Sequence, residues 1–98
     1  MKEEKIQLLH PFGKKNVRMD KEKYAIIRKA ILLSLKTGPL KHKELLEGIL
    51  KNFKKNKIKF DGSVEWYMEG VKLDMEATKV IQRLNEKPPH LWSIQKKK

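Results

Sequence analysis

Helix-boundary residues interrupt this 98-residue chain at three points and set where its helices begin and end. Asp20 is a favourable helix N-cap, Gly38-Pro39 is a stop signal, and Ser63 is a second N-cap that follows turn residues. These signals predict one helix from residue 21 to about residue 36 and another from Val64 to about Lys79. The chain is therefore expected to fold into several short elements around one core.

Apolar spacing indicates which faces of the helices are buried. In the first helix, apolar residues recur on one face at 100° per residue, at Tyr24, Ile27, Ile31 and Leu35. A second helix is predicted from Lys43 to about Phe53, with its inward residues at Leu45, Leu46, Ile49, Leu50 and Phe53. Gly48 lowers the intrinsic stability of that helix by about 1 kcal/mol relative to alanine, and it indicates a close helix crossing.

The third predicted helix carries two apolar stripes on roughly opposite faces. One stripe consists of Val64, Tyr67, Met68, Val71 and Met75, and the other consists of Trp66, Leu73 and Ala77. Adjacent helical residues point about 100° apart, so Trp66 and Tyr67 do not form one stacking surface for bases. We expect Tyr67 in the core, and we expect the N-terminal arm or a second subunit to cover Trp66 and Leu73.

The remaining segments predict strands and an arm. Leu40–His42 predicts a short bridge strand, and residues 80–84 and 90–94 predict a C-terminal hairpin in which Trp92 packs against the first helix. Residues 95–98 form a short basic tail. Residues 1–19 form an N-terminal arm, which is expected to dock through Leu8, Leu9, Phe12, Val17 and Met19.

The order helix, strand, helix, helix, strand, strand predicts a mainly α fold with a small β-hairpin. This order is winged-helix-like: three helices, a short bridge strand, a C-terminal two-stranded wing and an added N-terminal arm. The whole chain, residues 1–98, is expected to be a single domain, because 98 residues supply one hydrophobic core and not two.

Three segments also resemble a known family. They are His10-Pro11-Phe12-Gly13-Lys14, Trp66-Tyr67 and Val71-Lys72-Leu73-Asp74-Met75-Glu76-Ala77. Together with Lys23-Tyr24, they resemble a small family of bacterial proteins carried as a domain of unknown function. The resemblance implies a winged-helix-like fold and a single domain, and it supplies no catalytic or binding residue.

Composition excludes several classes of protein. The chain has no cysteine, so it has no disulfide, no thiolate metal site and no cysteine nucleophile. No apolar run approaches the roughly 18 to 20 residues that cross a bilayer, and the charged start does not resemble a signal peptide. We therefore expect a cytoplasmic protein without a membrane partner.

The polar residues show no catalytic pattern. His10, His42 and His90 lie in different predicted segments, so neither a metal site nor a cofactor is expected. Helical spacing predicts a solvated, salt-bridged face built from Glu65, Glu69, Lys72, Glu76 and Lys79. Asp74 falls off that face and is expected to meet a basic group of the arm or of the first helix. We expect the protein not to be an enzyme.

The net charge of +12 favours polyanionic partners. The candidate nucleic-acid-binding residues are Lys51, Lys54, Lys55, Lys57, Lys59 and Lys87. Residues 61–78 hold five acids and one base, a net charge of minus four, which opposes insertion of the third helix into a major groove. The sequence thus favours sequence-independent binding of nucleic acid. The alternative is a protein interaction or homodimerisation module, with Trp66 and Leu73 at the interface.

Overall fold

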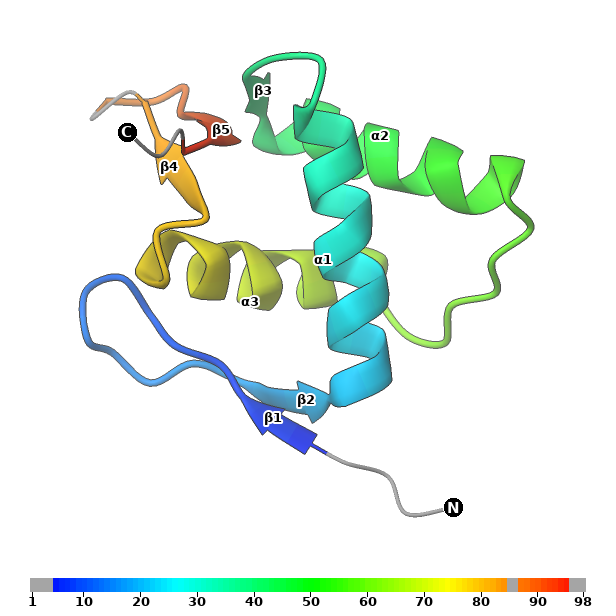
Figure 1. Cartoon of the computed structure of the whole chain (residues 1–98), viewed down its shortest axis with the longest axis horizontal. Coiled ribbons are helices and arrows are strands. Elements are labelled where there is room, and N and C mark those ends of the chain that lie inside the picture. Colours follow the sequence, from blue (N-terminus) through cyan, green and yellow to red (C-terminus); the bar gives the residue numbers. More distant parts are fainter. Residues whose placement is uncertain (1–4, 85–86, 96–98) are drawn as a thin grey trace.

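The computed structural model of the chain describes residues 5–84 and 87–95, and Figure 1 shows the arrangement of its elements. In chain order they are β1 (Lys5–Gln7), β2 (Arg18–Asp20), α1 (Lys21–Leu35), β3 (Leu40–Lys41), α2 (His42–Lys55), α3 (Val64–Ala77), β4 (Ile81–Arg83) and β5 (Leu91–Ile94). The three predicted helices and the predicted C-terminal hairpin are confirmed. Among the described helices, none has both the length and the apolar character needed to cross a membrane.

The helix boundaries follow the capping residues. The Asp20 carboxylate accepts a hydrogen bond from the Glu22 backbone N–H at 3.1 Å, and the Ser63 hydroxyl accepts one from the Trp66 backbone N–H at 3.2 Å. The second helix begins one residue before its predicted start, at His42. There the Glu44 carboxylate accepts a hydrogen bond from the Lys41 backbone N–H at 2.9 Å. The predicted N-caps of the first and third helices, Asp20 and Ser63, are therefore confirmed.

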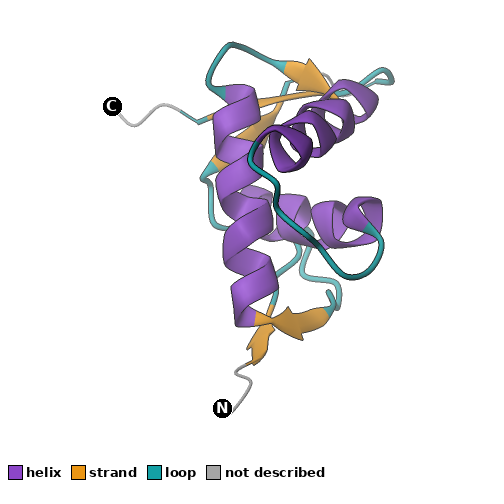
Figure 2. Ribbon diagram, turned by 90° about the vertical axis from the view of Figure 1, so that its right-hand side faces the viewer, coloured by secondary structure: helices purple, strands orange, loops and turns teal. Residues whose placement is uncertain are grey.

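The core lies between α1, α2 and α3, with α1 packed against both other helices (Figure 2). Ile27 and Ile31 of α1 are completely buried, as are Leu45 and Ile49 of α2. A Cβ atom at Gly48 would lie 2.9 Å from the Ser34 hydroxyl oxygen, so the close helix crossing predicted at Gly48 is confirmed.

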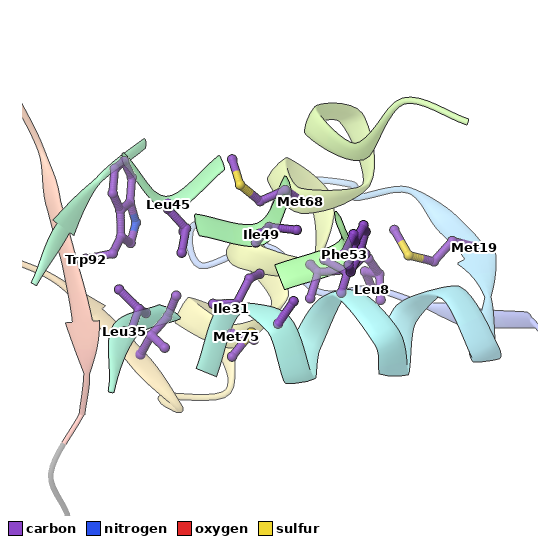
Figure 3. Packing of buried hydrophobic residues seen from close by; sticks show 14 residues of the cluster. Leu8, Met19, Ile31, Leu35, Leu45, Ile49, Phe53, Met68, Met75 and Trp92 are labelled. Atoms are coloured by element: carbon purple, nitrogen blue, oxygen red, sulfur yellow. The ribbon is translucent and has the colours of Figure 1, made fainter. Parts of the chain in front are cut away.

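A three-stranded antiparallel sheet in the order β3-β5-β4 closes one end of the core. Leu40 of β3 pairs with Trp92 of β5, and Gln82 of β4 pairs with Ser93. Trp92 and Leu35 lie at the same end of the buried cluster (Figure 3), and β5 contacts α1 as expected. In the predicted basic tail, the Gln95 backbone N–H donates to the Val80 carbonyl at 3.0 Å, and residues 96–98 lie outside the described residues.

The N-terminal arm is a hairpin in which β1 pairs with β2, and it runs beside α3 (Figure 1). Leu8 and Met19 are buried and Val17 packs against the core, as predicted. The predicted docking of Leu9 and Phe12 is wrong. Leu9 contacts α3 through its backbone N–H, which donates to Asp74, and its side chain is exposed. Phe12 is 72% exposed because it lies in the turn where the Gly13 N–H donates to the His10 carbonyl at 3.0 Å.

Candidate functional site

The predicted lysines gather along the end of α2 and the segment that follows it. Lys51, Lys54 and Lys55 lie on α2, Lys57 and Lys59 lie in residues 56–63, and all five side chains are exposed. We call residues 56–63 the connector; it runs along the outside of the molecule from α2 to α3 (Figure 2). In the described part of the chain, none of the five lysines forms an ion pair. Lys87 is also exposed, but it lies in the β4–β5 loop at the opposite end of the molecule (Figure 1).

The connector is fixed to the core by its apolar residues. The Ile58 backbone N–H donates to the Phe53 carbonyl at 2.8 Å, and the Phe60 ring stacks on the Phe53 ring with centroids 5.6 Å apart. Because Ile58 and Phe60 pack inward, the alternating residues Lys57 and Lys59 face outward. The connector therefore presents its charges from a fixed backbone.

The third helix is poorly placed to read a duplex. Its exposed residues include Glu65 and Glu69, which carry negative charge. The arm covers its middle: the Asn16 side-chain amide donates to the Gly70 carbonyl at 3.0 Å, and a Cβ atom at Gly70 would lie 2.8 Å from a methyl group of Val17. Both the negative charge of α3 and the arm packed on it oppose entry of this helix into the major groove of a duplex.

Trp66 and Leu73 differ in exposure. Trp66 is 46% exposed, and Leu73 is half-buried. The Trp66 ring contacts the half-buried Tyr67 edge to face, with centroids 4.9 Å apart, so Tyr67 is the inner member of the pair as predicted. The described part of the arm packs at Gly70 and leaves nearly half of Trp66 exposed.

Asp74 joins the arm to α1. The carboxylate is 5% exposed, and it accepts hydrogen bonds from the Leu9 backbone N–H at 2.9 Å and the Tyr24 hydroxyl at 2.7 Å. The predicted neighbours, the arm and the first helix, are thus correct, but the predicted basic partner is wrong. Burial, followed by the hydrogen bond and the negative charge of Asp74, raises the pKa of Tyr24 to about 12. This arrangement is structural, because each carboxylate oxygen binds a group of the fold itself.

Lys72 contradicts the predicted solvated face, because it is only 5% exposed. Its ammonium nitrogen lies 2.8 Å from Nδ1 of His42 and 3.7 Å from the centroid of the Trp92 ring. A lysine ammonium only donates, so Nδ1 of His42 accepts and Nε2 carries the proton. Nε2 then donates to the Glu65 carboxylate at 3.1 Å. The hydrogen bonds therefore run in one direction from Lys72 through His42 to Glu65.

Among residues 5–84 and 87–95, no carboxylate lies within ion-pair distance of Lys72. Burial lowers the pKa of Lys72 to about 8, although the more distant charges of Glu76, Glu69 and Glu65 act to raise it. Glu76, an acid of the same predicted face, has a side chain that is 8% exposed. It pairs with Arg83 at 3.3 Å and accepts a hydrogen bond from the Trp92 indole. This buried polar cluster fastens the C-terminal hairpin to α2 and α3.

The structure places two histidines that are far apart in sequence against the same aromatic ring. His42 and His90 both contact the Trp92 ring, with centroid separations of 6.4 and 6.0 Å, whereas His10 lies in the arm against Phe12. Across residues 5–84 and 87–95, no group of three or more potential ligand residues has a geometry able to hold a metal ion. The only sequence signal for the cluster was the β-prone run around Trp92, which does not reveal what the indole covers.

Comparisons with known proteins give a family and no function. Neither a curated protein nor a solved structure matches the chain significantly. A match to a family extends over residues 5–91, from β1 to the start of β5, and it includes the connector, the Asp74 contacts and the Lys72–His42 pair. The chain therefore belongs to the family of unknown function DUF6958.

Proposed function

We propose that this protein is a non-enzymatic, basic, winged-helix-like domain that binds nucleic acid through sequence-independent electrostatic contacts. The observation that carries the proposal is the group of five exposed lysines on the end of α2 and the connector. Their charges lack ion-pair partners in the described part of the chain and are available to phosphates.

The winged-helix assignment is supported by element order and by strand order. The elements run helix, strand, helix, helix, strand, strand from α1 onward, and the sheet has the order β3-β5-β4. In this assignment β4 and β5 form the wing. Winged-helix domains serve several functions, so the binding mode is inferred from the surface of this chain and not from its fold.

Sequence independence is supported by the identity and position of the charges. The connector carries lysines, which contact phosphates as point charges, and not arginines, which read guanine with two parallel hydrogen bonds. The acidic, arm-covered α3 is poorly suited to reading base edges in the groove of a duplex. If about four of the lysines neutralise phosphates, log affinity falls with log salt at a slope of about −3.6 on duplex DNA.

A fluorescence anisotropy titration tests the proposal with a labelled duplex of random sequence at several salt concentrations. The variant Lys54→Glu, Lys55→Glu, Lys57→Glu should abolish binding at low salt while keeping the native circular dichroism spectrum. The matched control is Lys14→Glu, Lys15→Glu, Lys29→Glu, which makes the same change of net charge at exposed lysines on the arm and α1. Equal loss of binding in both variants would show that only the overall charge matters. Absence of binding by the unmodified protein at low salt would refute the proposal.

Homodimerisation or another protein interaction through Trp66 and Leu73 is the second candidate function, favoured by the exposure of Trp66. Light scattering after size-exclusion chromatography, at increasing protein concentration, measures whether the protein is a monomer or a dimer and so tests this second function. A dimer that Trp66→Glu dissociates, together with no binding of nucleic acid, would establish this function in place of the first.

A further inference from the structure

Four aromatic rings form a continuous series between the core and the surface beside the connector. Phe53 stacks on Phe60 at 5.6 Å, Phe60 meets Tyr67 edge to face at 5.0 Å, and Tyr67 meets Trp66 at 4.9 Å. The first ring is buried, and the last is nearly half exposed. We call these four residues the aromatic series. It places an exposed indole at the end of α3 where the connector arrives.

Neighbouring contacts hold the aromatic series in place. The Lys23 ammonium lies 5.1 Å from the centroid of the Tyr67 ring and donates to the Asp61 carbonyl at 3.0 Å. A Cβ atom at Gly62 would lie 3.0 Å from the Tyr67 ring, so the backbone of the connector closes tightly over that ring. The Trp66 ring therefore packs against an ordered Tyr67 ring, so little conformational freedom is lost when a planar ligand covers Trp66.

We propose that the connector surface prefers single-stranded nucleic acid, with its phosphates on the connector lysines and one base stacked on Trp66. This inference rests on the proposed function and specifies its substrate class. In a duplex the faces of the bases are already stacked on one another, whereas a single strand offers them to an exposed aromatic ring. The combination of outward lysines and a fixed, exposed indole matches the requirements of a single strand.

The acids near Trp66 set the limits of the binding surface. Glu65 is held toward α2 by its hydrogen bond to His42. Glu69 is exposed and lies three residues after Trp66, on the same side of the helix, so it repels a phosphate placed there. The variant Glu69→Gln should therefore raise affinity for a single strand. The same two exposed acids oppose a protein interface centred on Trp66, because the centres of such interfaces are depleted of charge.

The test compares labelled oligothymidylate of 12 nucleotides with a 12-base-pair duplex of mixed sequence, both at low salt. The full chain should bind oligothymidylate more tightly than the duplex. Trp66→Leu should weaken oligothymidylate binding about 10- to 100-fold, which is the range expected from loss of one base–aromatic stack, and should change duplex binding less than about threefold. Phe12→Leu, which alters the exposed aromatic residue of the arm, is the matched control and should change neither affinity. Trp66→Phe retains a stacking ring and should lose less affinity than Trp66→Leu.

Tryptophan fluorescence gives a second readout on the unmodified protein. Oligothymidylate should quench the exposed Trp66 and leave the buried Trp92 emitting, so that quenching is partial and is absent in Trp66→Leu. Equal or tighter binding of the duplex, with no quenching, would overturn this inference and leave the proposed function intact. Failure to bind either nucleic acid would overturn both. Self-association that Trp66→Leu abolishes, again without quenching, would assign Trp66 to a protein interface and overturn the inference.

Discussion

The substitution Lys72→Met should make the protein at least as stable at pH 7 as it is with lysine. The Lys72 ammonium is buried beneath the Trp92 ring and hydrogen-bonds Nδ1 of His42, and no carboxylate among the described residues pairs with it. Replacing a buried charge by an apolar side chain of similar length removes the cost of desolvation and keeps the packing against the indole. The substitution also leaves Nδ1 of His42 without its donor, which offsets part of the gain.

The magnitude follows from the pKa of Lys72. Its ordinary value of 10.5 falls to about 8 in the folded protein, and this difference corresponds to about 3 kcal/mol. Because the folded-state pKa is the lower one, the unfolded chain binds more protons between pH 8 and pH 10.5. Unfolding free energy therefore rises with pH in this window. Between pH 7 and pH 9.5 the expected rise from this one group is about 2 kcal/mol.

Urea denaturation followed by circular dichroism at pH 7, 8, 9 and 9.5 measures this effect. The advantage of Lys72→Met over the unmodified protein should shrink by about 2 kcal/mol across the series. Measurements stop at pH 9.5 because Tyr24, with its pKa raised to about 12, lowers stability progressively above pH 10. Lys29→Met makes the same chemical change at an exposed position of α1, and its unfolding free energy should change with pH as that of the unmodified protein does. If the unfolding free energy of Lys72→Met also followed the pH dependence of the unmodified protein, the burial of a charged Lys72 would be refuted.

Two further predictions concern the docking of the arm, and chemical denaturation measures both. Asp74→Ala should lower the unfolding free energy by about 2–4 kcal/mol, because it leaves the Leu9 N–H and the Tyr24 hydroxyl without an acceptor. A loss below about 0.5 kcal/mol would contradict the anchoring role of Asp74. Leu8→Ala should lower the unfolding free energy by about 2–5 kcal/mol, whereas Phe12→Ala should change it by no more than about 0.5 kcal/mol. A larger loss for Phe12→Ala than for Leu8→Ala would contradict the observed packing of the arm.

Features set by neighbouring residues could be predicted from the sequence. The caps at Asp20 and Ser63 act on backbone groups two or three residues away, so their effect is visible in the local pattern. Gly48 marked the helix crossing because a side chain there would weaken the close approach to Ser34. The alternation of Lys57 and Lys59 with Ile58 and Phe60 is visible in the sequence, and in the structure the two apolar residues take the inward positions.

The polar cluster could not be predicted, because it depends on contacts between distant segments. Helical spacing placed Lys72 beside Glu76 on an exposed face, but Trp92, which lies 20 residues farther along the chain, covers that face. The hairpin also supplies Arg83, which takes the Glu76 carboxylate that the pattern assigned to Lys72. Similarly, a carboxylate at position 74 suggested a basic partner, whereas a backbone N–H and a hydroxyl satisfy it.

The contacts that dock the arm join positions far apart in the chain, and this separation bears on the order in which the protein assembles. The hydrogen bond from Leu9 to Asp74 spans 65 residues, and that from Asn16 to Gly70 spans 54. Closing loops of this length costs chain entropy that the local turns of α1 and α2 do not require. The arm is therefore expected to dock late, after α3 has packed on α1. In the folded protein, the Leu9 amide should exchange its hydrogen at a rate that reports release of the arm, even though Leu9 lies outside any strand.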